Sequence, residues 1–171
     1  MRKKWGRISD TNTPRSITSD HGDATGLSWR TRAAKLNACD DVQAFLDASF
    51  APWVLDLRPT VTQANAQGVT IDIPITQAIA RVGGIVSGQA LATLADTCMV
   101  LSVGAHLGKM VPVATVTLDT QFLRPALGDG IRAQAVVTRA GRSLAFARCT
   151  LTAWPDTKVA ALATATFALP V

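Results

Sequence analysis

One acidic residue stands in the middle of an apolar segment of this 171-residue chain. Asp96 lies within residues 87–100, where apolar residues surround the expected helix on every side. Such a helix is buried, and a buried carboxylate costs free energy unless it is paired, hydrogen-bonded or facing a polar cavity. Burial also raises a carboxyl pKa, which suits a general base. Two interpretations are open: a catalytic base, or a structural Asp that hydrogen-bonds backbone groups.

Few residues could supply a catalytic carboxylate, because the chain contains no Glu and its twelve acidic residues are all Asp. Two rivals of Asp96 have local explanations. Asp129 follows Gly128 in a turn, where Asp is common. Asp119 alternates with polar residues on a strand face that we expect to be solvated or at an interface.

Cysteine and histidine offer little alternative chemistry. Cys98 has no His at a motif spacing and lies in the apolar helix, which favours core packing. His106 follows that helix, where a surface position near the helix C-terminus is expected. The three cysteines are widely spaced and give no disulfide framework or zinc signature, so we expect no metal and a cytoplasmic location.

The periodic pattern predicts an α+β fold, with one long helix against an antiparallel sheet. The long helix runs from Ser87, a good N-cap, to about Ala105. Short connections make the later strands antiparallel neighbours. The other expected elements are a helix from Asp40 or Asp41 to Phe50, and strands over 54–63, 69–75, 113–123, 130–139, 143–154 and 158–169.

Charge divides the chain into two parts. Residues 1–38 hold eight basic and three acidic residues, whereas residues 39–171 hold nine of each. We therefore expect 1–38 to be a disordered or loosely attached basic segment and 39–171 to be one domain. We expect no secretory signal, because the basic N-terminal residues are not followed by an apolar stretch, and we expect Ala90–Ala105 to be too short and too polar to span a bilayer. No membrane or nucleic-acid partner is expected, although nucleic-acid binding by the basic segment is an alternative.

Several motifs together resemble a known family. The order and rough spacing of these motifs, over about residues 40–171, are similar to those of hotdog-fold acyl-CoA thioesterases of the phenylacetate-degradation, hydroxybenzoyl-CoA thioesterase-like type. The motifs are Gly88 followed by Leu94-Ala95-Asp96-Thr97, then Phe122-Leu123-Arg124-Pro125, Gly128-Asp129 and Gly141-Arg142.

The resemblance implies a curved antiparallel sheet around the long helix and hydrolysis of acyl-CoA thioesters. It implies that Asp96 is the nucleophile or general base and that the Gly88 amide polarises the thioester carbonyl. Ser87 is expected beside that amide, and Thr115 falls where some relatives place a hydroxyl that positions water. The expected substrate-binding residues are Gln89, Arg81, Arg139, Gly141 and Arg142, the last three near the CoA phosphates. Coenzyme A is part of the substrate, and no separate cofactor is implied.

Two departures from the family pattern keep other functions open. Ser87 replaces the family's His, and Arg81 falls near its Asn or Gln. The alternative function is a non-catalytic acyl-CoA-binding hotdog protein. A hotdog hydratase would need a catalytic His near the helix, and the family's helix-start His is absent.

Helix geometry constrains how the two expected groups act together. Gly88 and Asp96 are eight residues apart on one helix, or about 12 Å along its axis. One thioester carbon needs contacts near 3 Å from both groups, so they must come from different chains. The chemistry therefore predicts a homodimer or a dimer of dimers.

The charge division gives a first test. Deleting residues 1–38 should leave the melting temperature and the oligomeric state nearly unchanged, because that segment has no periodic apolar pattern. Thermal denaturation and size-exclusion chromatography of the full and truncated chains would measure this. A large fall in melting temperature would show that the segment packs on the domain.

Overall fold

The computed structural model describes residues 39–170, so the expectation for residues 1–38 lies outside the described residues. The observed elements are α1 (Cys39–Ser49), α2 (Pro52–Leu55), β1 (Thr60–Asn65), β2 (Gly68–Pro74), α3 (Gly88–Leu107), β3 (Ala114–Phe122), β4 (Gly130–Ala140), β5 (Leu144–Trp154) and β6 (Val159–Ala168). The expected α+β layout, with one long helix packed on a curved antiparallel sheet, is confirmed.

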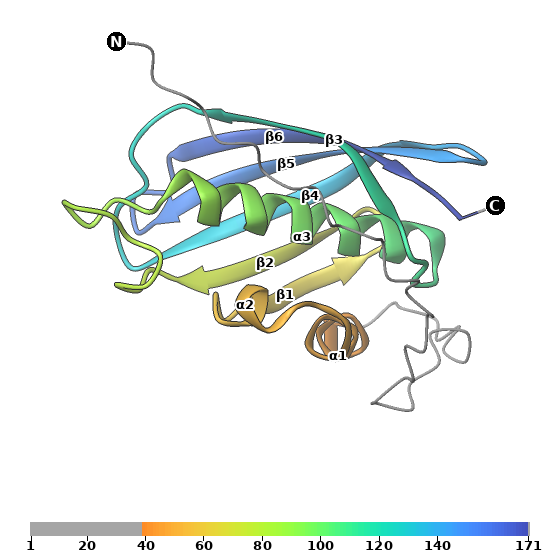
Figure 1. Cartoon of the computed structure of the whole chain (residues 1–171), viewed down its shortest axis with the longest axis horizontal. Coiled ribbons are helices and arrows are strands. Elements are labelled where there is room, and N and C mark those ends of the chain that lie inside the picture. The colour runs from red at the N-terminus through yellow and green to blue at the C-terminus, as the bar shows by residue number, and fades with distance from the viewer. Residues whose placement is uncertain (1–38, 171) are drawn as a thin grey trace, which may run out of the picture. The chain divides into compact units, whose positions relative to one another are not determined.

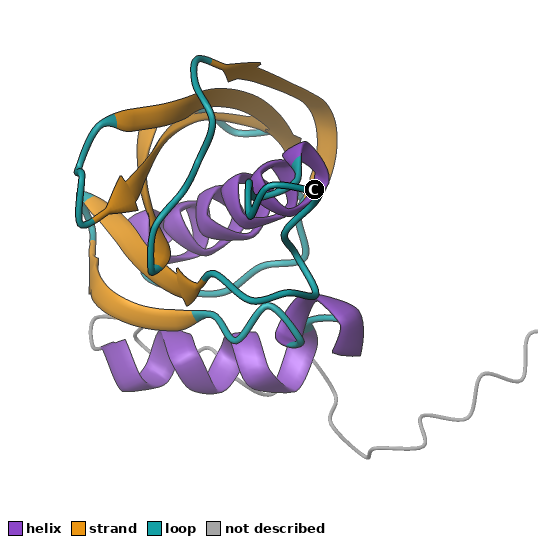
Figure 2. Ribbon diagram, turned by 90° about the vertical axis from the view of Figure 1, so that its left-hand side faces the viewer, coloured by secondary structure: helices purple, strands orange, loops and turns teal. Residues whose placement is uncertain are grey.

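The six strands form one antiparallel sheet in the order β1-β2-β4-β5-β6-β3. The sheet curves around α3, which runs along its inner face (Figures 1 and 2). The helix α1 lies outside this wrap, beside β1. Because the sheet encloses α3, the helix and the inner sheet face form a common core.

Small side chains on the inner sheet face allow the helix to lie close to it. Buried positions of β4, β5 and β6 alternate with more exposed ones, and many of the buried ones are Ala. The Ser102 hydroxyl of α3 donates to the Ala135 carbonyl at 3.2 Å, and the Cys98 thiol lies 3.4 Å from the Val69 carbonyl oxygen. Polar atoms of α3 thus reach the sheet backbone directly, which fixes the helix on the sheet.

Both ends of α3 are capped, and the sequence predicts the cap at the N-terminal end, Ser87. The Ser87 hydroxyl accepts a hydrogen bond from the Ala90 amide at 3.3 Å. At the other end, Gly108 has φ +67°, the left-handed conformation that glycine adopts readily. The helix ends at Leu107, two residues beyond its expected end near Ala105.

The judgement that this segment is too short and too polar for a bilayer is wrong. By length and composition α3 could span a membrane, but 67% of its most apolar 18-residue window is buried inside the domain. A buried core helix meets the same criteria, and the contacts of α3 with the sheet give it that role here.

Two expectations for the strands are also wrong. The sequence predicts a strand over residues 54–63, interrupted at Pro59, but α2 and a turn occupy 52–59 and the strand begins at Thr60. Pro52 favours this outcome, because proline is well tolerated in the first turn of a helix. In addition, β3 is not a neighbour of β4: it crosses to the far edge and pairs with β6.

The common core predicts a large effect of truncation in α3. Leu101 is fully buried, so Leu101→Ala should lower the free energy of unfolding by about 2–5 kcal/mol. Leu162→Ala is the matched control, because Leu162 is 39% exposed and should cost far less. Urea denaturation of both variants would measure the difference. Equal losses would mean that α3 is not central to the core.

Candidate active site

The start of α3 presents free backbone amides. The hydroxyl of Ser87 is occupied with the Ala90 amide, and within residues 39–170 the Gly88 and Gln89 amides have no hydrogen-bond acceptor. A Cβ at Gly88 would lie 3.2 Å from Cζ of Phe122, so the glycine allows the aromatic ring to approach the helix start. Free first-turn amides and the helix dipole favour negative charge developing beside them.

One stripe of α3 is less buried than the rest, which corrects the expectation of burial on every side. Asp96 lies on this stripe and is half-buried, in line with the partly exposed Thr93 and Val100. Most other residues of α3 from Ala90 onward are buried. The carboxylate therefore reaches the surface along one face of an otherwise enclosed helix.

Asp96 has a specific polar neighbour. The hydroxyl of Thr115, the second residue of β3, donates to Asp96 Oδ1 at 3.2 Å. Burial raises the pKa of the Asp96 carboxyl above its ordinary value, and the hydrogen bond from Thr115 acts in the opposite direction. A raised pKa moves a carboxyl toward the range in which it can accept a proton near neutral pH.

A cavity of about 400 Å³ opens at the start of α3. It contains two of the expected residues, Arg81 and Gly88. Sequence reasoning missed Phe122 as a lining residue, although the motif containing it was recognised. The lining consists of Arg81, Ile85, Val86, Gly88, Leu91, Phe122, Leu123, Arg124, Pro125 and Ala126.

The expected residues fall into two groups within one chain. Ser87, Gly88, Gln89 and Arg81 lie at the start of α3. Asp96 and Thr115 meet farther along the helix, and the structure does not bring Gly88 and Asp96 together, since eight residues of helix separate them.

The β4–β5 hairpin belongs to the Thr115 end of the sheet. Its tip is closed by a hydrogen bond from the Gly141 amide to the Leu144 carbonyl, as the predicted hairpin requires. Ala168 of β6 pairs with both Leu144 and Ala114, so this end of the sheet also holds the first residues of β3. Arg139 and Arg142 are both exposed there.

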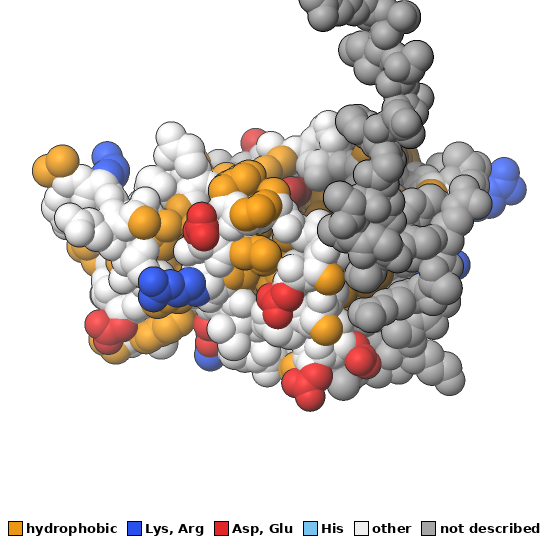
Figure 3. All heavy atoms as spheres, turned by 60° about the horizontal axis from the view of Figure 1, so that its bottom comes forward, with side chains coloured by type: hydrophobic (Ala, Val, Ile, Leu, Met, Phe, Trp, Pro, Cys, Tyr) orange, Lys and Arg blue, Asp and Glu red, His pale blue; other side chains and the backbone are white. Residues whose placement is uncertain are grey.

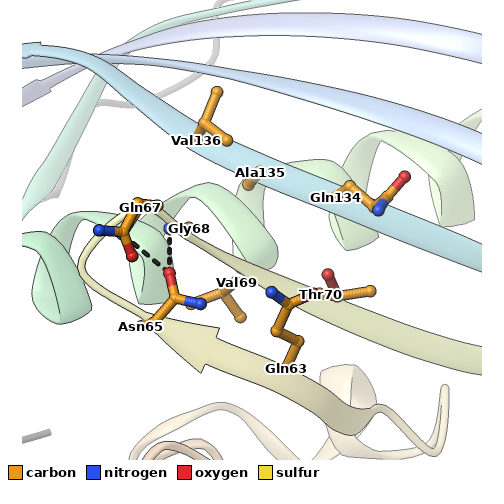
Figure 4. A pocket seen from close by; sticks show the side chains of 9 residues that line it. All are labelled: Gln63, Asn65, Gln67, Gly68, Val69, Thr70, Gln134, Ala135 and Val136. Carbon is orange, nitrogen blue, oxygen red and sulfur yellow. Dashed lines mark hydrogen bonds between the residues drawn. The ribbon is translucent and has the colours of Figure 1, made fainter. Parts of the chain in front are cut away.

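A second cavity, of about 360 Å³, lies on the outer face of β1, β2 and β4 (Figure 4). It contains none of the expected residues. Its rim consists of uncharged carboxamides, and the Asn65 side-chain oxygen is occupied with the Gln67 and Gly68 amides at 2.9 and 3.2 Å. The lining consists of Gln63, Asn65, Gln67, Gly68, Val69, Thr70, Gln134, Ala135 and Val136.

Cys98 is buried as expected, whereas His106 lies in the last turn of α3 and not beyond the helix. Cys98 is fully buried, and burial raises the pKa of its thiol well above the ordinary value, which disfavours the reactive thiolate. His106 is exposed, with Nδ1 at 3.2 Å from the Ala66 carbonyl oxygen. In the part of the chain that the structure describes, no three His, Cys or acidic side chains gather as possible metal ligands.

Comparison with known proteins adds independent findings. The family model of the thioesterase superfamily matches residues 83–160, which include α3 and Asp96. A protein of Halobacterium salinarum whose name designates an esterase is 36% identical over 106 residues, covering 59% of this chain and 70% of that protein. A protein of Thermoplasma volcanium named in the same way is 31% identical over 78 residues, or 46% of this chain. The match spans only 58% of that relative's length.

Solved structures agree on the fold. The structure of a protein of Silicibacter sp. TM1040, titled as a thioesterase, superimposes with a TM-score of 0.72 at 25% identity. The similarity covers 81% of this chain and 96% of that one.

The environment of Asp96 predicts a pH-dependent stability. Because burial raises its pKa, the folded protein binds this proton more tightly than the unfolded chain, and the ionised carboxylate lowers stability at neutral pH. Asp96→Asn should therefore be more stable than the wild type at pH 7. The advantage should shrink as the pH falls through the folded-state pKa and vanish below the unfolded value of about 3.9.

Urea denaturation at pH 7 and pH 3 would measure this difference. Asp119→Asn, on the exposed strand β3, controls for the loss of one negative charge. A stability difference between Asp96→Asn and the wild type that is the same at both pH values would contradict the buried-charge description.

Proposed function

The chain belongs to the thioesterase superfamily and has its hotdog fold, and on this basis we propose that it hydrolyses acyl-CoA thioesters with Asp96 as the catalytic carboxylate. The observation that supports this most is the position of Asp96 itself. It is the one acidic residue of α3, it is half-buried on the exposed stripe, and it is hydrogen-bonded to Thr115. The narrower assignment to the phenylacetate-degradation type rests on the motif resemblance and is part of the proposal.

Each group has a role that its surroundings suit. Asp96 acts as the nucleophile or as the base that activates water, and Thr115 orients the carboxylate or the water through its hydroxyl. The Gly88 amide, and beside it that of Gln89, donates to the carbonyl oxygen as negative charge develops. Ser87 acts through its cap, which holds these amides at the helix start.

Two chains are proposed to complete each site. One chain supplies the Gly88 end with Arg81, and the other supplies Asp96 and Thr115. The β4–β5 hairpin lies at the Thr115 end, so Arg139, Gly141 and Arg142 would come from the same chain as Asp96. Guanidinium groups there suit the phosphates of CoA.

The two edges of the sheet support a dimer through β3. At the β1 edge, the Gln43 side chain of α1 accepts from the Val61 amide at 2.8 Å and donates to the Pro59 carbonyl at 3.2 Å, so it protects that edge. No described residue protects the β3 edge in this way. On β3, Val116 is 58% and Phe122 54% exposed. An open edge with apolar side chains is suited to pairing with a second copy.

A non-catalytic acyl-CoA-binding protein is the second candidate. It is favoured by Ser87, which stands where the family has His and whose hydroxyl is occupied in capping α3. Such a protein would keep the cavity and the arginines but would release no thiol from any thioester.

Asp96→Asn separates the two functions. The change keeps the side-chain volume and the acceptor for Thr115 but removes the base, so it should preserve the fold and lower kcat by about 10² or more. Release of free thiol from a panel of acyl-CoAs would measure kcat. Full activity of the variant on a substrate of the wild type would exclude Asp96 as the catalytic carboxylate, and no turnover of any thioester by the wild type would favour the binding protein.

Mixed subunits extend this test to the shared site. Gly88→Val places a side chain against Phe122 and should block the helix start. If sites are shared, mixing this variant with Asp96→Asn restores one intact site per mixed dimer, and up to about one quarter of wild-type activity returns. Each variant refolded alone is the control. No recovery from a demonstrably mixed dimer would place both groups of a site in one chain.

A further inference from the structure

The cavity at the start of α3 has an unbalanced charge. Arg81 and Arg124 both line it, and no acidic residue does. The ion pairs formed within residues 39–170 are Arg132 with Asp72 and Lys158 with Asp156, so neither cavity arginine is paired with a carboxylate there. Both arginines are exposed, and they line one concave site without a carboxylate partner among the described residues.

This concentration of positive charge is local. Residues 39–171 have no net charge. On the face seen in Figure 3, Lys and Arg side chains stand apart from one another, with acidic side chains among them. By contrast, Arg132 on the outer sheet face contacts both carboxylate oxygens of Asp72, through Nε at 2.8 Å and through Nη2. Arg81 and Arg124 thus differ from Arg132 in having no carboxylate partner among the described residues, and from the exposed Arg139, Arg142 and Arg148 in lining one cavity together.

The rest of the lining is apolar. Leu91, Phe122 and Pro125 are among the residues that line the cavity with the two arginines. Much of this lining is exposed, with Phe122 54% accessible, so it offers apolar contacts at the surface to the apolar part of a ligand. The combination suits a ligand that has an apolar part and an anionic group.

We propose that Arg81 and Arg124 together bind an anionic group of the thioester substrate in this cavity. The inference rests on the proposed function, which puts the thioester carbonyl at the Gly88 amide in the same cavity. Planar guanidinium groups bind phosphate and carboxylate with two hydrogen bonds each. Arg124 is then a specificity-determining residue. Arg81, which falls near the Asn or Gln of the family pattern, contributes a positive charge to the same anion site.

The anion has two possible sources within one substrate. It is either a phosphate of the CoA moiety or a carboxylate at the far end of the acyl group. Four substrates distinguish them: the glutaryl and valeryl thioesters of CoA and of N-acetylcysteamine. The two acyl groups have equal carbon number and differ in one carboxylate, and N-acetylcysteamine lacks the phosphates.

The variants are Arg81→Ala and Arg124→Ala in the full-length chain. Arg148→Ala is the matched control, because Arg148 is exposed on β5 and lines neither cavity. Loss of a charge-assisted hydrogen bond should raise KM about tenfold and leave kcat nearly unchanged. Arg124→Lys keeps the positive charge and should reverse part of the increase in KM that Arg124→Ala causes. A merely structural role of Arg124 predicts no such dependence on charge.

The pattern of loss identifies the source. A raised KM for both CoA thioesters, with no change for the N-acetylcysteamine thioesters, assigns the arginines to a CoA phosphate. A raised KM for glutaryl but not valeryl thioesters, on either carrier, assigns them to an acyl carboxylate. KM values that match those of Arg148→Ala for all four substrates would overturn the proposal.

Direct binding keeps this result separate from the failure of catalysis. Calorimetric titration of the Asp96→Asn protein with CoA and with glutaryl-N-acetylcysteamine requires no turnover. If one of these ligands binds and Arg124→Ala weakens it about tenfold, the inference stands even where no thioester is hydrolysed. Equal dissociation constants with and without Arg124, for both ligands, would refute it whatever the activity.

Discussion

Close packing of α3 against the inner face of the curved sheet positions both the Gly88 end and the Asp96 end of the candidate site. Alanines on β4, β5 and β6 leave room for the helix, and Ser102 and Cys98 contact backbone carbonyls of the sheet. Because this contact fixes the axis of α3, it also fixes where the helix starts, beside Phe122, and where Asp96 meets Thr115. A shift of the helix would move both ends of the site together.

The same packing explains why a carboxylate is tolerated on a core helix. The sheet covers most of the circumference of α3 but leaves the stripe with Asp96 partly exposed, next to the inner face of β3. The carboxyl is thus desolvated enough for its pKa to rise, while one hydroxyl and the surface remain within reach. Full burial would leave a charge without solvent, and full exposure would leave an ordinary aspartate.

Much of the fold follows from local patterns that the structure confirms. The Ser87 cap, the buried helix, the hairpin at Gly141 and the late strands all depend on neighbours close in sequence. The two wrong expectations for the strands have different causes. The helix α2 is held by local hydrogen bonds behind Pro52, a signal that the alternating apolar pattern concealed. The crossing of β3 to the far edge depends on pairing with the distant β6, which local periodicity does not encode.

The sequence by itself determined which residue types are available: a single acidic residue on the long helix, a glycine at its start, and no Glu anywhere. It also determined, through the rise of a helix, that Gly88 and Asp96 are too far apart to meet at one atom. Only the tertiary structure decided that Thr115 meets Asp96 and that Arg124 shares a cavity with Arg81. These pairs lie 19 and 43 residues apart, and the path of the chain through the sheet brings them together because the buried apolar surface of α3 requires strands from distant segments to cover it.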